Sequence, residues 1–119
     1  MGFSDPDELV IGFLERLVGV PVGTEVPNPR PDKFIRVMRT GNSRLSAAHR
    51  MIQETVECWD ASGEAAAARF ADQVEALLSD WEEIPASEDG WVSGSVPERD
   101  EDTGVSRYVL TVVFPQFWE

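Results

Sequence analysis

Four prolines between residues 20 and 33 constrain this chain more than any other feature of its sequence. Proline has no backbone N–H group and fixes its own φ angle, so a segment this rich in proline cannot be helical and must run extended. We interpret it as a connector between a helix and a sheet. The valines Val20, Val22 and Val26 leave a short edge strand as the alternative.

A helix is predicted before the connector, over about residues 6–18. Asp5 suits the N-cap, Pro6 the first helical position, and Glu8 the third position after the cap. Gly19 is expected to end the helix. The apolar side chains that recur at helical spacing are Leu9, Val10, Phe13, Leu14, Leu17 and Val18.

Two strands are predicted after the connector, at residues 34–40 and 51–59. Residues 41–43 have the composition of a turn, and residues 42–50 are polar and small, so we expect an exposed loop between the strands. In the second strand one face combines Ile52, Val56 and Cys58 with Glu54, and the other combines Met51, Gln53, Thr55, Glu57 and Trp59.

The strongest helical pattern covers residues 64–79, with Ser62 or Asp60 as the expected cap. Its apolar stripe, which we assign to the core, contains Ala67, Phe70, Ala71, Val74, Leu77 and Leu78.

Two further strands are predicted at residues 91–96 and 105–114, after a loop at residues 85–90. The acidic segment between them, residues 97–104, ends in glycine and is typical of a hairpin with a longer loop. One face of the last strand is expected to meet the helices, and it carries Tyr108, Leu110, Val112 and Phe114.

The resulting order, α-β-β-α-β-β, predicts a single α+β domain over residues 1–119. We expect a mostly antiparallel four-stranded sheet with two helices packed on one face. The other face mixes valine, threonine and methionine with charges, which makes it a candidate for association.

Charge is segregated along the chain, whose net charge is −12. Residues 30–50 hold six basic residues against one acid, whereas residues 51–104 hold fifteen acids against two basic residues. We predict that the basic segment of one copy faces the acidic segment of the next. The alternatives are that the charges only form a solvated surface, or that Arg36 and Arg39 pair with acids in their own domain. The expected interface residues are Arg30, Arg36, Arg39, Arg44, Glu98, Asp100, Glu101, Asp102, Phe117 and Trp118.

The sequence contains little that suggests catalysis, a metal or a cofactor. A Cys58–His49 nucleophile pair is the one remaining candidate, and Cys58 lies in an apolar strand. Close carboxylates such as Glu54 and Glu57 are expected by chance in so acidic a chain. No apolar run is long enough to cross a membrane, and the acidic first residues lack the pattern of a signal peptide. We therefore expect a non-enzymatic protein that is made in the cytoplasm.

Short segments along nearly the whole chain resemble the tail terminator (tail-completion or head–tail joining) proteins of long-tailed bacteriophages. The similarity departs at Gly41-Asn42, where Gly-Gly is more typical, and over residues 43–50. The matching segments are Val20-Pro21, Val26-Pro27, Arg30-Pro31 before Phe34-Ile35-Arg36-Val37, Arg39-Thr40-Gly41, Glu54-Thr55-Val56-Glu57-Cys58-Trp59 before an alanine-rich helix, and Thr103-Gly104-Val105-Ser106-Arg107-Tyr108 leading into Thr111-Val112.

The resemblance implies a structural virion protein at the head–tail interface. Members of the family form a homohexameric ring that caps the finished tail tube and presents a surface to the head. The implied partners are further copies of the chain, the major tail tube protein, and a head-completion or connector protein. DNA is expected to pass through the lumen without specific binding.

An acidic interaction module, such as a DNA-mimic inhibitor, is the alternative function. It accounts for the net charge of −12 but not for the basic segment at residues 30–50. A small enzyme is the third hypothesis, and it rests only on Cys58, His49 and scattered acids.

Overall fold

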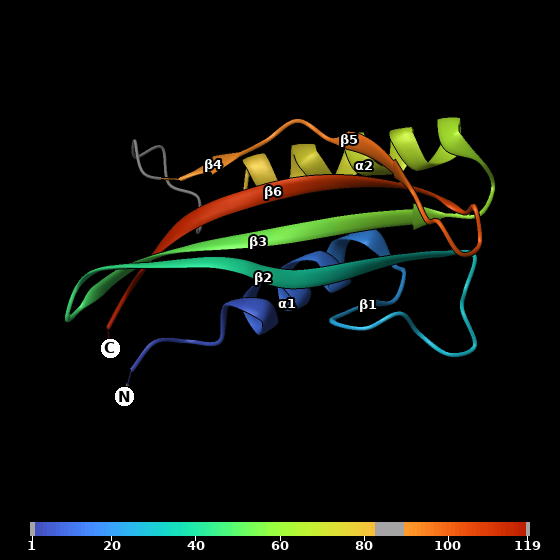
Figure 1. The fold of residues 1–119 in the computed structure, drawn as a ribbon. Helices are drawn as coiled ribbons and strands as arrows, with labels where there is room; N and C mark the ends of the chain where they lie inside the picture. The colour runs from blue at the N-terminus through green and yellow to red at the C-terminus, as the bar shows by residue number, and fades with distance from the viewer. Residues whose placement is uncertain (1, 83–89, 119) are drawn as a thin grey trace.

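The computed structural model describes residues 2–82 and 90–118 and has an α+β fold, as predicted (Figure 1). Of the loop expected at residues 85–90, only Gly90 belongs to the described part of the chain. The elements in chain order are α1 (Pro6–Val18), β1 (Val22–Gly23), β2 (Lys33–Ser46), β3 (His49–Asp60), α2 (Glu64–Ser79), β4 (Trp91–Val92), β5 (Val96–Arg99) and β6 (Ser106–Phe117).

The sheet has six strands and is mixed, so the predicted four-stranded sheet was incomplete. The strand order is β1-β2-β3-β6-β4, and β5 also pairs with β6. All pairs are antiparallel except β1 with β2. The extra parallel strand is β1, which forms within the proline-rich connector because Pro21 C=O accepts from Ile35 N at 2.9 Å. The edge-strand alternative for the connector is therefore confirmed for Val22.

The strand predicted at residues 91–96 is divided into β4 and β5. The strand is interrupted at Ser93. The side-chain hydroxyl of Ser93 accepts the hydrogen bond from Thr111 N, at 2.8 Å, that a backbone carbonyl would accept in a regular strand pair. The predicted acidic loop starts later than expected, since β5 continues to Arg99 and pairs Glu98 with Arg107.

The loop predicted at residues 42–50 is wrong, because β2 and β3 continue as a long hairpin that turns only at residues 47–48. We call residues 39–53 the hairpin arm. The ladder pairs Ser43 with Met51 and Ser46 with His49, and β6 extends along it as far as Phe117. Gly41 sits at an irregularity where an added Cβ would lie 3.1 Å from the Cβ of Gln53, so the close strand contact favours glycine.

Both helices have the predicted bounds. Asp5 caps α1 and accepts from Asp7 N at 2.9 Å, while Gly19 ends it at φ 65°. The expected cap of α2 is wrong, since Gly63 occupies the N-cap and no side-chain cap is formed among the residues described. Asp60 instead accepts from Ser62 N at 2.9 Å and stabilises the turn before the helix.

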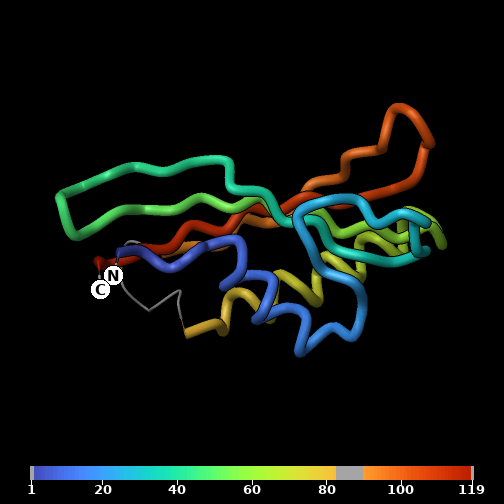
Figure 2. Tube along the Cα trace, turned by 90° about the horizontal axis from the view of Figure 1, so that it is seen from below, coloured from blue at the N-terminus to red at the C-terminus, as the bar shows by residue number. Residues whose placement is uncertain are grey.

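The two helices pack on one face of the sheet (Figure 2), which is the arrangement the sequence predicted. The face of β3 that carries Ile52, Val56 and Cys58 is buried there together with the predicted inward face of β6, and Tyr108 packs against this core. The core contains Val10, Leu14, Val22, Ile35, Val37, Ile52, Val56, Cys58, Phe70, Ala71, Val74, Leu78, Trp81, Leu110, Val112 and Phe114.

The domain is elongated, with extents of 44 × 27 × 26 Å. The hairpin arm lies at one end, beside the first and last described residues, and the turn between β5 and β6 lies at the other (Figures 1 and 2). The two protruding segments therefore point to opposite ends of the molecule.

Candidate interaction surface

No helix covers the face of the sheet opposite α1 and α2 within the described part of the chain (Figure 2). Its central row, set by strand register, contains Met38, Thr55 and Thr111, all partly exposed. Trp91 and Val96 lie toward its β4–β5 edge and are 49% and 57% exposed. This agrees with the mixed apolar and polar face that the sequence predicted.

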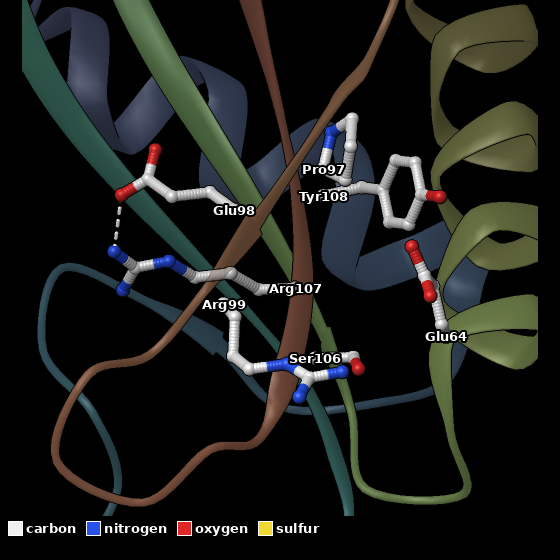
Figure 3. Close-up of a pocket in the computed structure, with 7 residues that line it drawn as sticks. All are labelled: Glu64, Pro97, Glu98, Arg99, Ser106, Arg107 and Tyr108. Atoms are coloured by element: carbon white, nitrogen blue, oxygen red, sulfur yellow. Dashed lines mark hydrogen bonds and ion pairs between the residues drawn. The ribbon is translucent and has the colours of Figure 1, made fainter.

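A charge network covers one part of this face. Glu57 is only 5% exposed, and its carboxylate lies 3.6 Å from Arg36 and 3.6 Å from Arg107. Trp59 Nε1 donates to Glu57 at 3.2 Å, and Arg107 also binds Glu98 (Figure 3). Two residues of the predicted interface, Arg36 and Glu98, are thus paired within their own domain.

Trp59 lies beneath this network, and its ring makes cation–π contacts with two arginines. The guanidinium groups of Arg30 and Arg107 lie 5.1 and 4.8 Å from its ring centroid, and Phe34 stacks on it at 5.2 Å. Arg30 also donates to Thr103 Oγ1 at 3.2 Å, which joins the connector to the β5–β6 turn. These contacts favour the alternative in which part of the basic segment serves its own domain.

A small cavity opens beside the network (Figure 3). Its volume is about 30 Å³, and it has room for only about one or two water molecules. Tyr108 points from β6 toward α2 on one side of it. The lining residues are Glu64, Pro97, Glu98, Arg99, Ser106, Arg107 and Tyr108. The cavity is too small to bind an organic substrate.

Three arginines gather at the hairpin arm, and we call Arg39, Arg44 and Arg50 the arginine patch. Burial, and then the nearby charges of Arg39 and Arg44, lower the pKa of Arg50. Arg39 lies 3.9 Å from Asp5, which is the one salt bridge of the patch in the described residues. Arg44 donates to the carbonyl of Ala47 at 3.0 Å. Counting the described residues, the patch retains an excess of positive charge.

Arg50 was not predicted as a site residue, and it holds the arm to the N-terminal segment. It donates twice to Gln116 Oε1, at 2.7 and 3.0 Å, and to the carbonyl of Ser4 at 3.5 Å. The ring of Phe3 lies beneath Arg50 and Arg44, at 4.2 and 5.0 Å from their guanidinium carbons. The partners of Arg50 lie far from it in the sequence. The residues around Arg50 therefore give no indication that its side chain joins the arm to the N-terminal segment.

The predicted aromatic residues end β6 beside the turn of the arm. Trp118 N donates to Ala48 C=O at 2.8 Å, and its ring meets Phe3 edge-on at 5.3 Å. Phe117 stacks on His49 at 4.6 Å. Both aromatics are nevertheless more than half exposed, at 61% for Phe117 and 51% for Trp118, so they have free apolar surface.

The acidic turn, residues 100–104, lies at the opposite end. Asp100 accepts from Thr103 N at 3.1 Å, and its carbonyl accepts from Gly104 N at 2.8 Å. The hydrogen bond from the Thr103 hydroxyl lowers the pKa of Asp100. Glu101 and Asp102 are exposed at the tip, without a salt bridge to any described residue. The turn is internally braced and presents two free carboxylates.

Glu54 is a buried acid. It is close to Glu57 in the sequence, but the two side chains lie on opposite faces of β3. Glu54 is fully buried against the helical layer. Burial, followed by the adjacent carboxyl group of Asp7, raises the pKa of Glu54 to about 9. Glu54 therefore keeps its proton at neutral pH, and the two acids do not form a catalytic carboxylate pair.

The Cys58–His49 nucleophile pair is excluded by geometry. Both residues lie on β3, nine positions apart, and a strand rises about 3.3 Å per residue, so roughly 30 Å separates them. Burial also raises the pKa of the Cys58 thiol to about 12. In residues 2–82 and 90–118, no group of three or more histidine, cysteine or acidic side chains is placed to hold a metal ion.

No helix among the described residues has the length and apolar character needed to span a membrane. Comparison with protein-family models and with curated proteins found no match to the chain.

Proposed function

We propose that this protein is a ring-forming tail terminator, a structural virion protein that caps the tail tube of a long-tailed bacteriophage and joins it to the head connector. The observation that carries the proposal is the exposed tip of the hairpin arm. Residues 42–48 are all exposed, and Leu45, Phe117 and Trp118 at the same end are each at least half exposed. Large apolar side chains gathered at one protruding end mark a surface that binds protein.

The uncovered sheet face supports the same proposal. This face has partly exposed apolar side chains in addition to those of the arm. The outer edge of β2 is also open, because β1 pairs only with residues 35–36. Beyond that point no other described strand lies on this side of β2. A ring protein must offer such surfaces to neighbouring copies, to the tube and to the connector.

The proposed ring leaves DNA free to slide. The outward faces of the helices carry exposed acids, including Glu8 and Glu15 on α1 and Asp72 on α2. Acids that face a channel repel phosphate, so we expect the free protein not to bind duplex DNA measurably at physiological salt. Tight binding that weakens steeply with salt would contradict a sliding channel, because that slope counts phosphate contacts.

Native mass spectrometry and electron microscopy of the protein mixed with tail tubes test the proposal. We expect a cyclic homo-oligomer, in the form of a hexamer, at the end of the tubes. Monomer in dilute solution is compatible with rings that form only on the tube. Tubes that remain uncapped at saturating protein, with monomer in both measurements, would refute the proposal.

An acidic interaction module is the second candidate, and the exposed acids of the helices favour it. It leaves the arginine patch and the exposed aromatic tip without a role. A monomeric mass together with tight, salt-sensitive binding to a basic protein would select this function over the ring.

A further inference from the structure

The arginine patch and the acidic turn have opposite charge and are separated along the long axis of one elongated domain (Figures 1 and 2). Arg44 lies near one end, Arg39 lies midway along β2, and the turn lies at the other end. The patch belongs to the hairpin arm, whereas the acidic turn follows β5. With the long extent of the domain at 44 Å, the two surfaces are too far apart to meet in the same molecule. Any contact between them must join two copies.

Both surfaces have charge that the described residues of their own domain leave unpaired. In the described residues the patch has one carboxylate partner, Asp5, for its three arginines. Among the residues that the structure describes, the exposed Arg44 contacts a carbonyl group and the ring of Phe3. At the other end, Glu101 and Asp102 project from a turn that is already ordered by its own hydrogen bonds. An ordered turn loses little conformational freedom on docking.

We propose that the acidic turn of one copy docks on the arginine patch of a second copy, with Glu101 and Asp102 facing Arg39 and Arg44. The proposal rests on the proposed ring function and names the contact that builds the ring. It also replaces part of the interface expected from the sequence. Arg36 is paired with the buried Glu57 and Glu98 with Arg107, so they are not the residues that join copies. Arg39 remains a candidate because its partner in the described residues, Asp5, is half exposed and 3.9 Å away.

The charges also decide how copies are arranged. Two arms placed side by side would bring two arginine patches together, and two acidic turns would repel each other in the same way. A patch-to-turn contact can be made reciprocally in an antiparallel dimer or head to tail. The proposed ring requires the head-to-tail form, in which each copy uses its patch toward one neighbour and its turn toward the other. A head-to-tail contact of this kind closes into a ring or extends as a filament.

Charge-swapped variants test the contact. The first, Arg39→Glu with Arg44→Glu, makes the patch acidic; the second, Glu101→Lys with Asp102→Lys, makes the turn basic. Arg50 is left unchanged because it holds Gln116 and Ser4. Matched controls carry the same charge changes on exposed helix positions: Arg16→Glu with Arg69→Glu, and Glu15→Lys with Asp72→Lys.

We expect each swapped variant alone to self-associate at least tenfold more weakly than the unmodified chain, by sedimentation and on tail tubes. Mixing the two variants restores association, because each then finds opposite charge at both ends. The mixed assemblies contain the two variants in equal numbers, which native mass spectrometry resolves. The helix controls assemble as the unmodified chain does.

The proposal is overturned if the swapped variants assemble normally, or if the mixture is no better than either variant alone. It is also overturned if the unmodified chain never self-associates, in solution or on tubes. Thermal melting checks that each variant folds. Arg44→Glu alone is the fallback, since in the described structure it loses one carbonyl contact and the contact with Phe3.

The outcomes separate this contact from the function. If the charge-swapped variants form rings that cap tubes as the unmodified chain does, the contact is refuted and the tail terminator function stands. If each swapped variant alone fails to assemble, the mixture assembles, and the assemblies never bind a tail tube, the function is refuted and the contact stands.

Discussion

The two faces of the sheet each bury a glutamate of β3, and they deal with its charge in different ways. On the uncovered face, Glu57 meets Arg36 and Arg107 and accepts a hydrogen bond from Trp59. On the helical face, Glu54 is fully buried beside Asp7, and its pKa is raised to about 9. Arg39 lies nearby but pairs with Asp5.

This difference follows from what covers each face. On the helical face Glu54 is buried beside the carboxyl group of Asp7, and a buried acid with a second acid next to it retains its proton. Long arginine side chains themselves cover the other face, so Glu57 is buried by the groups that bind it. Glu54 is thus accommodated on the helical face by keeping its proton, and Glu57 is accommodated on the other face by ion pairs. Substitutions can test the two cases separately.

The largest expected effect comes from removing the acid of the charge network. Glu57→Ala leaves Arg107, only 15% exposed, without its most buried partner. Breaking a buried ion pair in this way costs about 3–5 kcal/mol, and we expect a loss of about 3 kcal/mol in the free energy of unfolding by urea titration. Glu57→Gln, which can still accept from Trp59, is the control and should lose less. A loss below about 1 kcal/mol for Glu57→Ala would show that the network does not stabilise the fold.

The next effect concerns Glu54 and pH. Between the ordinary pKa of 4.5 and the folded value of about 9, the folded chain holds a proton that the unfolded chain has released. Unfolding then releases a proton, so the stability contribution is complete below the lower pKa and is lost as pH rises to the upper one, by at most about 1.4 kcal/mol per pH unit. We expect Glu54→Gln, which cannot ionise, to be more stable than the unmodified chain by about 2 kcal/mol at pH 8.

Denaturant titrations at several pH values measure this difference. The two chains should converge below pH 4.5 and diverge as pH rises. A constant difference across the whole range would mean that Glu54 does not titrate between these values, and the contrast between the two faces would fail.

A smaller effect is expected at Arg36, which is more exposed than Arg107. Its side chain is 32% exposed and has contacts with Glu57 and the carbonyl of Thr24. Arg36→Glu should lower the free energy of unfolding by about 1–2 kcal/mol, because it places a second acid against Glu57. A lower melting temperature without a specific loss of assembly confirms that Arg36 serves its own domain. Unchanged melting with lost assembly would return Arg36 to the interface between copies.

The smallest effect on folding is expected at Arg44. Arg44→Ala removes an exposed side chain of the arm, so its free energy of unfolding should stay within about 0.5 kcal/mol of the unmodified value. Association between copies should nonetheless weaken measurably by sedimentation. Equal loss of stability at Arg44 and Arg36 would erase the distinction between the arm and the charge network.

Local sequence determined the two helices, including their bounds. Asp5 and Pro6 define the start of α1, because a cap and a preorganised first turn act within a few residues. The apolar stripe of α2 identified its buried side for the same reason. The inward face of β6 was also predictable, since alternation along a strand is a local property.

Tertiary structure decided the hairpin arm and the roles of the arginines. An exposed hairpin has no buried face, so residues 42–50 carry no alternation to reveal β2 and β3, and only pairing with each other and with β6 orders them. The sequence grouped Arg36, Arg39 and Arg44 by proximity along the chain, and strand register separated Arg36 by placing it opposite Glu57. The position of a partner across a sheet depends on contacts between distant segments, which composition and periodicity do not contain.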